Sequence, residues 1–311
     1  MSRVIRIGTR DSELALWQAK TVQKALKNLG YSSEMIPVKS KGDVVLDKPL
    51  YEFGITGIFT RTLDIAMLSG DIDIAVHSMK DVPTKLPKGI VQAAIMKRGN
   101  STDILLHKGL DFLNQNGVIA TGSLRRKAQW LHQYPHHQVV GLRGNVNTRL
   151  RKLKENDWNG AIFAAAGLER IALKPNHIEK DSLQVMDLDW MLPAPAQGAM
   201  LVVAKEEDED FREILMNLNH RKSEICTHVE RQFLRILEGG CSAPIGALAK
   251  IENETVNFTG GLFSLDGKEK FIEKMSFPVS RYENAGKKAA QSILERGGER
   301  LMKQIKETLQ K

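Results

Sequence analysis

The chain has 311 residues, of which 42% are hydrophobic, with a formal net charge of +8 and two cysteines. This length is typical of two or three domains, and so few cysteines exclude a disulfide scaffold and favour a reducing compartment, the cytoplasm. No run of about 20 apolar residues is present, and the first residues, MSRVIRIGTRDSE, include charged side chains from Arg3 on and no apolar core segment, so neither a membrane span nor a secretory signal is expected.

Strand and helix patterns alternate through the first part of the chain. The predicted elements are a strand at 3–8, a helix from the N-cap Ser12 to about Leu29, a strand at 34–38, a polar loop at 39–57, a helix at 58–68 and a strand at 73–76. This order predicts an α/β sheet, and the short apolar strand 73–76 is expected to be buried on both faces if that sheet is parallel.

The same alternation returns after residue 117. The predicted elements are a strand and then a turn within 118–122, strands at 138–142 and 160–166, helices at 123–134 and 145–155, and a helical turn through Arg170. Strands alternating with helices predict parallel sheets with helices on both faces. The pattern breaks at 97–103 and 192–198, which we interpret as hinges between domains. A helix is predicted over 208–237, and residues 243–311 read as three strands and one long helix, a small α+β domain.

Arginines recur where a predicted strand ends and a helix begins. Ligands of open α/β sheets bind beyond the carboxyl ends of strands, where helix N-termini and arginine forks favour carboxylates or phosphates. These turns predict one anionic ligand held by Arg10, Arg125, Arg126, Arg143 and Arg149. The alternative for each arginine is a surface ion pair with a nearby acid.

The segment AVHSMKDVP (75–83) also lies just past the end of a predicted strand. Asp81 could stabilise a developing cation or move a proton, and Lys80 could bind a carboxylate. The alternative is a polar loop with a weak Lys–Asp surface pair. His77 is interpreted as structural, because no second ligand stands at metal-binding spacing, and no metal site is predicted.

Cys241 stands in the glycine-rich loop LEGGCSAPIG (237–246). A thiol there could be a nucleophile, a metal ligand or the covalent anchor of a cofactor, or an ordinary small loop residue. A metal site is poorly supported, because no second cysteine stands at CxxC spacing from Cys241. A catalytic nucleophile is poorly supported, because the sequence shows no recognisable Cys–His–Asn arrangement. Cys226 is expected to be buried and inert.

Two further polar segments are less specific. Gln197 in PAPAQGAM (193–200) either contacts a polar ligand or marks a simple chain crossing. HQYPHHQ (132–138) holds three histidines without metal-ligand spacing and is predicted to be a solvated turn.

Seven collinear segments resemble the porphobilinogen deaminase (hydroxymethylbilane synthase) family over essentially the whole chain. They are IGTRDSELALWQA (7–19), DIAVHSMKDVP (73–83), TGSLRRKAQ (121–129), LRGNVNTRL (142–150), AAAGLER (164–170), LPAPAQGA (192–199) and LEGGCSAPIG (237–246). The resemblance implies a transferase that joins four porphobilinogen molecules head to tail, expels ammonia each time and releases the linear tetrapyrrole hydroxymethylbilane.

The resemblance also implies a role for each matching residue. Cys241 matches the thioether anchor of a dipyrromethane cofactor, and Asp81 matches the catalytic aspartate, which contacts pyrrole N–H groups and stabilises the azafulvene-like cation left by ammonia loss. The positions that match contacts to the carboxylates of the pyrrole chain are Arg10, Lys80, Arg125, Arg126, Arg143, Arg149 and Arg170. The matching hydroxyl positions are Ser12, Thr121 and Ser123, and the remaining cleft contacts are Gln18, Phe59 and Gln197.

The implied fold has two α/β domains like those of type II periplasmic binding proteins, with a hinge and a cleft, plus a small C-terminal α+β domain. The expected boundaries are 1–98 with 198–218, then 99–197, then 219–311. A monomer in the cytoplasm, without nucleic-acid or membrane partners, is expected. The chain departs from the family at three places. Thr56 stands where lysine is usual, Ser242 stands where glutamine is common, and PAPAQGA replaces the commoner PAVGQGA. The substitution at Thr56 affects the expected closure of the 40–57 loop.

Two other function classes compete with this one. A non-catalytic binder of a small polycarboxylate on the same two-lobed fold would explain the arginine turns, but not the third domain or Cys241. A nucleic-acid binder is suggested by the net charge alone, and arginines gathered at strand-to-helix turns, rather than in a stripe interleaved with aromatic residues, disfavour it.

Overall fold

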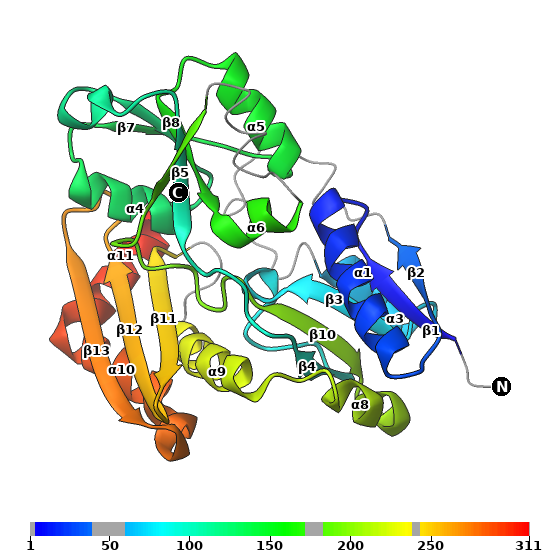
Figure 1. Cartoon of the computed structure of the whole chain (residues 1–311). Coiled ribbons are helices and arrows are strands. Elements are labelled where there is room, and N and C mark those ends of the chain that lie inside the picture. Colours follow the sequence, from blue (N-terminus) through cyan, green and yellow to red (C-terminus); the bar gives the residue numbers. More distant parts are fainter. Residues whose placement is uncertain (1–3, 39–59, 172–182, 238–242, 311) are drawn as a thin grey trace. The chain divides into compact units, whose positions relative to one another are not determined.

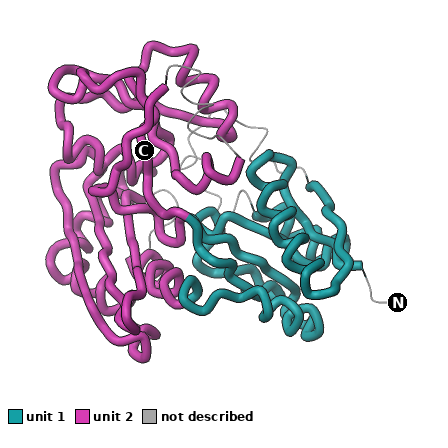
Figure 2. Tube along the Cα trace, viewed as in Figure 1, with its two compact units in different colours: residues 1–45, 55–99, 198–224 teal, residues 46–54, 100–197, 225–311 magenta. Residues whose placement is uncertain are grey.

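The computed structural model describes residues 4–38, 60–171, 183–237 and 243–310. These residues form two compact units, drawn in teal and magenta in Figure 2. The first holds residues 4–38, 60–99 and 198–224, and the second holds 100–171, 183–197, 225–237 and 243–310. None of the helices in these ranges is both long enough and apolar enough to cross a membrane.

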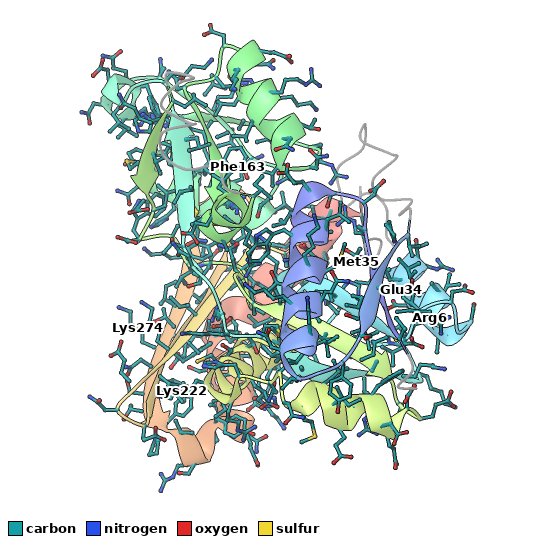
Figure 3. All side chains as sticks on the ribbon, turned by 45° about the vertical axis from the view of Figure 1, so that its right-hand side comes forward. Arg6, Glu34, Met35, Phe163, Lys222 and Lys274 are labelled. Atoms are coloured by element: carbon teal, nitrogen blue, oxygen red, sulfur yellow. The ribbon has the colours of Figure 1, made fainter. Side chains whose placement is uncertain are left out.

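The first unit is built on a five-stranded sheet with the order β2-β1-β3-β10-β4 (Figure 1). Its strands are β1 (Ile5–Thr9), β2 (Ser33–Pro37), β3 (Ile74–Ser78), β4 (Ile90–Ile95) and β10 (Met200–Lys205). Its helices are α1 (Glu13–Asn28), α3 (Arg61–Leu68), a 3-10 turn (Met79–Asp81) and α8 (Glu209–Met216). Strands β1, β2 and β3 are parallel, and in their register Arg6 lies opposite Glu34 and Ile7 opposite Met35 (Figure 3).

Helix α1 forms because its cap and its apolar spacing agree. The Ser12 side chain accepts a hydrogen bond from the Ala15 backbone N–H, so the predicted N-cap is confirmed. Ala19, Val22 and Leu26 recur at helical spacing and are fully buried against the sheet. The helix therefore fixes the turn between β1 and α1 at one edge of the sheet.

The second unit contains a five-stranded sheet with the order β7-β6-β8-β5-β9. Its strands are β5 (Asp103–His107), β6 (Val118–Ala120), β7 (Gln138–Val140), β8 (Gly160–Ala164) and β9 (Gln184–Asp187). Its helices are a 3-10 turn (Asp111–Asn114), α4 (Leu124–Gln133), α5 (Val146–Glu155) and α6 (Ala165–Arg170). Phe163 of β8, labelled in Figure 3, is part of the buried core of this sheet.

Neither five-stranded sheet is purely parallel, so the expectation of parallel sheets is wrong for the fourth strand of each. Strand β10 is antiparallel to β3, with Met200 opposite Ser78, and β5 is antiparallel to β8, with Asp103 opposite Ala164. In both cases the chain enters the sheet at the edge where the parallel strands end. A strand that starts at that edge has to run away from it, which makes it antiparallel.

The C-terminal part of the second unit is a three-stranded antiparallel sheet with helices. Its elements are β11 (Ile245–Glu252), β12 (Thr255–Phe263), β13 (Lys270–Pro278), α9 (Arg221–Ile236, which begins in the first unit), a 3-10 segment (Val279–Asn284), α10 (Ala285–Ile293), a π turn (Leu294–Gly298) and α11 (Glu299–Leu309). Val229 and Phe233 of α9 are fully buried in its core. The expected fold class, α/β with a small C-terminal α+β part, is confirmed.

Two long helices predicted from the sequence are each broken. The predicted helix 208–237 is interrupted between α8 and α9, because the backbone N–H of His220 donates to the oxygen of Ile95 at 2.7 Å and Asn219 Oδ1 accepts from the Ile95 N–H at 2.9 Å. The C-terminal helix is interrupted between α10 and α11 at Gly297, whose φ of 110° is incompatible with a helix.

The segment 132–138 is not wholly the solvated turn expected from its composition. His137 is buried, and its Nδ1 accepts the indole N–H of Trp130 at 3.1 Å. Its Nε2 therefore carries the proton and donates to the backbone oxygens of Phe112 and Gln115, at 3.1 and 3.0 Å. Cys226 is buried, as predicted.

Candidate functional site

In the first unit, the ends of β1 and β3 bring four predicted site residues to one edge of the sheet. The two strands are parallel neighbours, so Arg10 and Ser12, which follow β1, lie at the same edge as Lys80 and Asp81, which follow β3. Arg10, Ser12, Lys80 and Asp81 are all half-buried. This edge therefore carries two cations and a carboxylate that a ligand can reach.

Among the four residues Arg10, Ser12, Lys80 and Asp81 at this edge, Asp81 is the one that carries a negative charge. It stands at the end of a 3-10 turn, and it makes no hydrogen bond or ion pair with any residue in the described ranges. Gln18, predicted to be a cleft contact, is buried and donates its Nε2–H to Ser78 Oγ at 2.8 Å. Gln18 thus ties α1 to the strand end that leads into the Asp81 turn.

His77 is buried at the same strand end, in agreement with the structural role predicted for it. Burial, followed by the charge of Arg10, lowers the pKa of His77 to about 4. Within the described part of the chain its Nε2 has no hydrogen-bond partner. The imidazole is therefore neutral near pH 7, and protonating it would place an unpaired charge in the interior.

We expect His77 to make the stability of the protein fall on acidification. The pKa of His77 is about 4 in the folded chain and about 6.5 in the unfolded chain. The unfolded chain therefore binds the proton first, and stability is lost as the pH falls through this window, by about 3 kcal/mol. Urea unfolding between about pH 7 and about pH 4 measures it. His77→Gln should flatten this dependence and the exposed-site variant His136→Gln should not; an unchanged slope in His77→Gln would contradict the assignment.

In the second unit, three parallel strands end at one edge and are followed by predicted site residues. Thr121 follows β6, Arg143 follows β7 and α6 follows β8. Thr121 Oγ1 accepts the Ser123 N–H at 3.3 Å, and Ser123 caps α4 by accepting the Arg126 N–H at 3.5 Å. The two hydroxyls thus shape the turn that opens α4.

Arg143, Arg149 and Arg170 follow strands of this sheet in the sequence, and they differ in the groups around them. Burial lowers the pKa of Arg143, which is half-buried and has no hydrogen bond or ion pair with a described residue. Burial also lowers the pKa of Arg170, against the opposing charge of Glu169. Arg149 donates its Nε–H to the oxygen of Gly144 at 2.7 Å. A partly desolvated guanidinium without an anion fits the carboxylates of a ligand.

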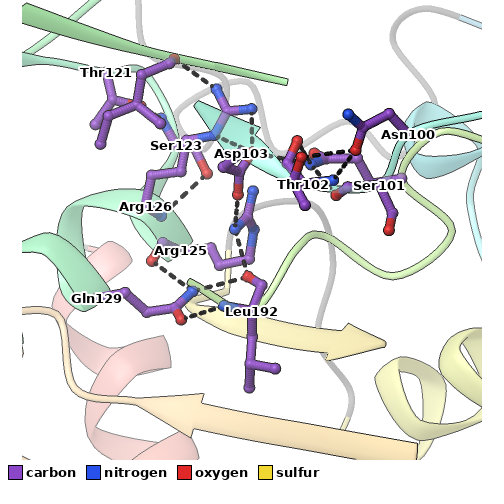
Figure 4. Close-up of polar contacts among 12 residues, drawn as sticks. Asn100, Ser101, Thr102, Asp103, Thr121, Ser123, Arg125, Arg126, Gln129 and Leu192 are labelled. Carbon is purple, nitrogen blue, oxygen red and sulfur yellow. Dashed lines mark hydrogen bonds and ion pairs between the residues drawn. The ribbon is translucent and has the colours of Figure 1, made fainter. Parts of the chain in front are cut away.

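Arg125 and Arg126 are not surface arginines, because both are buried beside Asp103 (Figure 4). Arg125 Nη1 lies 2.6 Å from Asp103 Oδ2, and Arg126 Nη2 lies 2.8 Å from Oδ1. Burial alone would raise the pKa of Asp103, but the two guanidinium charges outweigh it and hold that pKa well below its usual range. Burial lowers the pKa of Arg125, against the opposing effect of Asp103.

Gln197 joins the same carboxylate. Its Nε2–H groups donate to Asp103 Oδ1 at 2.9 Å and to the oxygen of Ser101 at 2.8 Å. Asp103 is not among the predicted site residues, because it falls in the segment 97–103 that is predicted to be a hinge. The available signal was an acidic residue opening the apolar strand DILLH (103–107), at the edge where ligands bind. Phe59 and Cys241 lie outside the described residues.

Ala196 has a strained backbone next to this cluster. Its φ is 63°, which is a left-handed conformation. Ala196 stands at the position where PAVGQGA, the commoner form of this segment, has glycine. Its N–H donates to Glu230 Oε2 at 2.7 Å, and the other oxygen of Glu230 accepts the Ala249 N–H at 2.7 Å. A buried carboxylate therefore holds the strained turn in place.

We expect Ala196→Gly to be nearly neutral for stability. Relief of about 1–2 kcal/mol of left-handed strain offsets the loss of a buried methyl group, about 0.8 kcal/mol, together with the extra backbone entropy of glycine in the unfolded chain, about 0.5–1 kcal/mol. Ala247→Gly is the matched control, because Ala247 is equally buried without a positive φ. It should lower the free energy of unfolding by about 1–2 kcal/mol in urea titrations. Equal losses in the two variants would show that Ala196 carries no strain.

Comparison with known proteins gives matches along nearly the whole chain. Residues 5–213 match the family model described as "Porphobilinogen deaminase, dipyromethane cofactor binding domain", and residues 224–295 match "Porphobilinogen deaminase, C-terminal domain". A curated porphobilinogen deaminase of Chloroherpeton thalassium is 43% identical over 282 residues, covering 89% of this chain and 88% of the relative. That of Pelotomaculum thermopropionicum is 40% identical over 316 residues, covering 99% and 98%. Among solved structures, the VFT2 domain of Bordetella pertussis BvgS matches 69% of this chain and 86% of its own at 12% identity, with a TM-score of 0.43.

Proposed function

The chain belongs to the porphobilinogen deaminase family, and we propose that it joins four porphobilinogen molecules head to tail into hydroxymethylbilane, with release of ammonia at each addition. The reaction is a step of tetrapyrrole (haem) biosynthesis and makes the protein a transferase. The observation that carries the proposal is the unpaired, half-buried Asp81 carboxylate, at the edge of the sheet shared with Arg10 and Lys80.

Asp81 acts on the charge that develops when ammonia leaves. Loss of ammonia from porphobilinogen makes the pyrrole cationic, and a fixed carboxylate beside it lowers that barrier. The same carboxylate accepts hydrogen bonds from pyrrole N–H groups. Arg10 and Lys80 bind the acetate and propionate groups of the incoming ring, and Ser12 supports them.

The residues of the second unit fit a dipyrromethane cofactor, attached through a thioether at Cys241. Each ring brings two carboxylates, and the partly desolvated Arg143 offers a cation without a described partner. Arg149 and Arg170 add further cations, and Thr121 and Ser123 add hydroxyls. Gln197 is a further proposed contact of this unit, and Gln18 and Phe59 are proposed contacts outside it. When bound, the dipyrromethane supplies the end of the chain to which new rings are added.

We also propose the division into three domains, 1–98 with 198–218, 99–197 and 219–311, and a monomer that works in the cytoplasm without a nucleic-acid partner. The boundaries of the two compact units, after residues 99 and 197, support the first two domains. The separate core around Val229 and Phe233 supports the third.

Turnover of porphobilinogen tests the function directly. The purified protein should release four ammonia molecules for each hydroxymethylbilane formed, and its intact mass should show a ladder of adducts that differ by one pyrrole unit. Binding of porphobilinogen without ammonia release would overturn the proposal in favour of a non-catalytic polycarboxylate binder.

A further inference from the structure

Glu230 of α9 is a fully buried carboxylate that joins two backbone segments. Its Oε2 accepts the Ala196 N–H and its Oε1 accepts the Ala249 N–H, both at 2.7 Å. Both backbone groups are donors, so they cannot bond to each other, and the side chain between them has to supply two acceptor atoms. An ionised carboxylate does so, whereas the amide of a glutamine has one acceptor oxygen and one donor nitrogen.

The first of these bonds goes to a β-turn over residues 194–197. The Gln197 N–H donates to the oxygen of Ala194 at 2.8 Å, and the two central residues are Pro195 and Ala196, the latter with a φ of 63°. Proline followed by a residue of positive φ is the pattern of a type II turn, which normally has glycine at the second of these positions. With alanine there, the conformation of the turn is strained and depends on contacts that hold it.

The turn sets the place of the Gln197 side chain, which is a proposed site residue. Gln197 is buried, and its Nε2 donates to Asp103 Oδ1 at 2.9 Å and to the oxygen of Ser101 at 2.8 Å. Asp103 is the carboxylate that pairs with Arg125 and Arg126 (Figure 4). A change in the backbone of the turn would therefore withdraw the amide from the cluster around Asp103.

The second bond of Glu230 secures the outer edge of β11. Strand β11 pairs with β12 along its other edge. On the outer edge the Ala247 N–H donates to the oxygen of Pro193 at 2.9 Å, and the Ala249 N–H donates to Glu230. In the sequence, α9 and β11 flank the loop that holds Cys241. One side chain thus ties both of these elements to the turn that carries Gln197.

We infer that Glu230 is a positioning residue, which holds the turn 194–197 against α9 and β11 and thereby keeps the Gln197 amide on Asp103. This role rests on the proposed function for the reaction that it serves. Alanine at position 196 makes the hold necessary, because a strained turn can relax once the bond to its N–H is lost. Glu230 and Ala196, which are 34 positions apart in the chain, are therefore coupled.

Glu230→Gln tests this role, because it keeps the shape of the side chain and leaves one acceptor for two N–H groups. We expect it to lower the kcat/KM for porphobilinogen about tenfold, as a misplaced site residue does, and to lower the urea midpoint. Adding Ala196→Gly should restore most of kcat/KM, since glycine takes a positive φ without strain. The midpoint should recover only in part, because one N–H stays without an acceptor.

Two control variants separate this role from a general loss of packing. Ala247→Gly, at an equally buried alanine without a positive φ, should restore neither property when it is added to Glu230→Gln. Glu307→Gln makes the same chemical change at an exposed position of α11 and should keep the kcat/KM and the midpoint of the parent.

A Glu230→Gln variant with the parent's kcat/KM would overturn the inference, and so would equal recovery from Ala196→Gly and Ala247→Gly. If the parent chain makes no hydroxymethylbilane, the proposed function fails. The urea midpoints of the single and double variants then still decide whether Glu230 and Ala196 are coupled, because uncoupled changes would add.

Discussion

Replacing Asp81 by alanine is expected to lower kcat by about 10²–10³-fold, the usual loss when one preorganised electrostatic group is removed from a reacting centre. The fold should survive, because the Asp81 carboxylate has no hydrogen bond or ion pair with a described residue to lose. The attached dipyrromethane should also survive, since its anchor lies elsewhere in the chain. Steady-state turnover of porphobilinogen, with intact mass and urea unfolding of the same preparation, measures all three properties.

Two further variants separate charge from shape at this position. Asp81→Asn keeps the size of the side chain but removes the charge, and it should be nearly as inactive as the alanine variant. Asp111→Ala, at an exposed aspartate of another 3-10 turn, should turn over at the rate of the parent. Normal turnover by Asp81→Ala would remove Asp81 from the mechanism, whatever the behaviour of the arginines.

Replacing Cys241 by serine should abolish both the covalent adduct and turnover. A thioether needs sulfur as the attacking atom, and a serine hydroxyl is a far weaker nucleophile than a thiolate at neutral pH. The intact mass of the parent chain should exceed its sequence mass by two linked pyrrole units, and that of Cys241→Ser should not. Incubation with porphobilinogen should restore the adduct to a cofactor-free parent and leave Cys241→Ser unmodified.

Cys226 provides the matched control for this experiment, because it is the other cysteine of the chain and is buried in α9. Cys226→Ser should keep the adduct and the activity. An adduct of the same mass on Cys241→Ser, or its disappearance from Cys226→Ser, would show that the anchor has been assigned to the wrong residue.

The features that could be predicted from the sequence are the local ones. Ser12 and Ser123 cap helices through hydrogen bonds to the residue three positions ahead, so both caps follow from short segments. The carboxyl-edge positions of Arg10, Asp81 and Arg143 follow from the strand–turn–helix order alone. Such features depend on few residues, and no distant partner has to be known.

The features that could not be predicted depend on distant partners. The break between α8 and α9 exists because Asn219 binds Ile95, which is 124 positions away in the chain. The ion pairs of Arg125 and Arg126 required knowledge that β5 is antiparallel and starts at the ligand edge, which places Asp103 beside α4. His137 is buried because Trp130 and two carbonyl groups bind its ring, and its polar neighbours in the sequence gave no sign of this.

The position of β10 between β3 and β4 has a consequence for synthesis on the ribosome. Strands β3 and β4 have left the ribosome long before β10, which follows β4 by about 100 residues, or roughly 5–20 s at ordinary elongation rates. Until then, in the sheet order of the described strands, β3 pairs with β1 alone and β4 has no neighbour, and unpaired strand edges invite association with other chains. The strands of the second five-stranded sheet, β5 to β9, all lie within residues 103–187, so none of them is separated from its neighbours by so long a delay. The nascent protein can therefore complete its second sheet before its first, because β10 follows every strand of the second sheet in the chain.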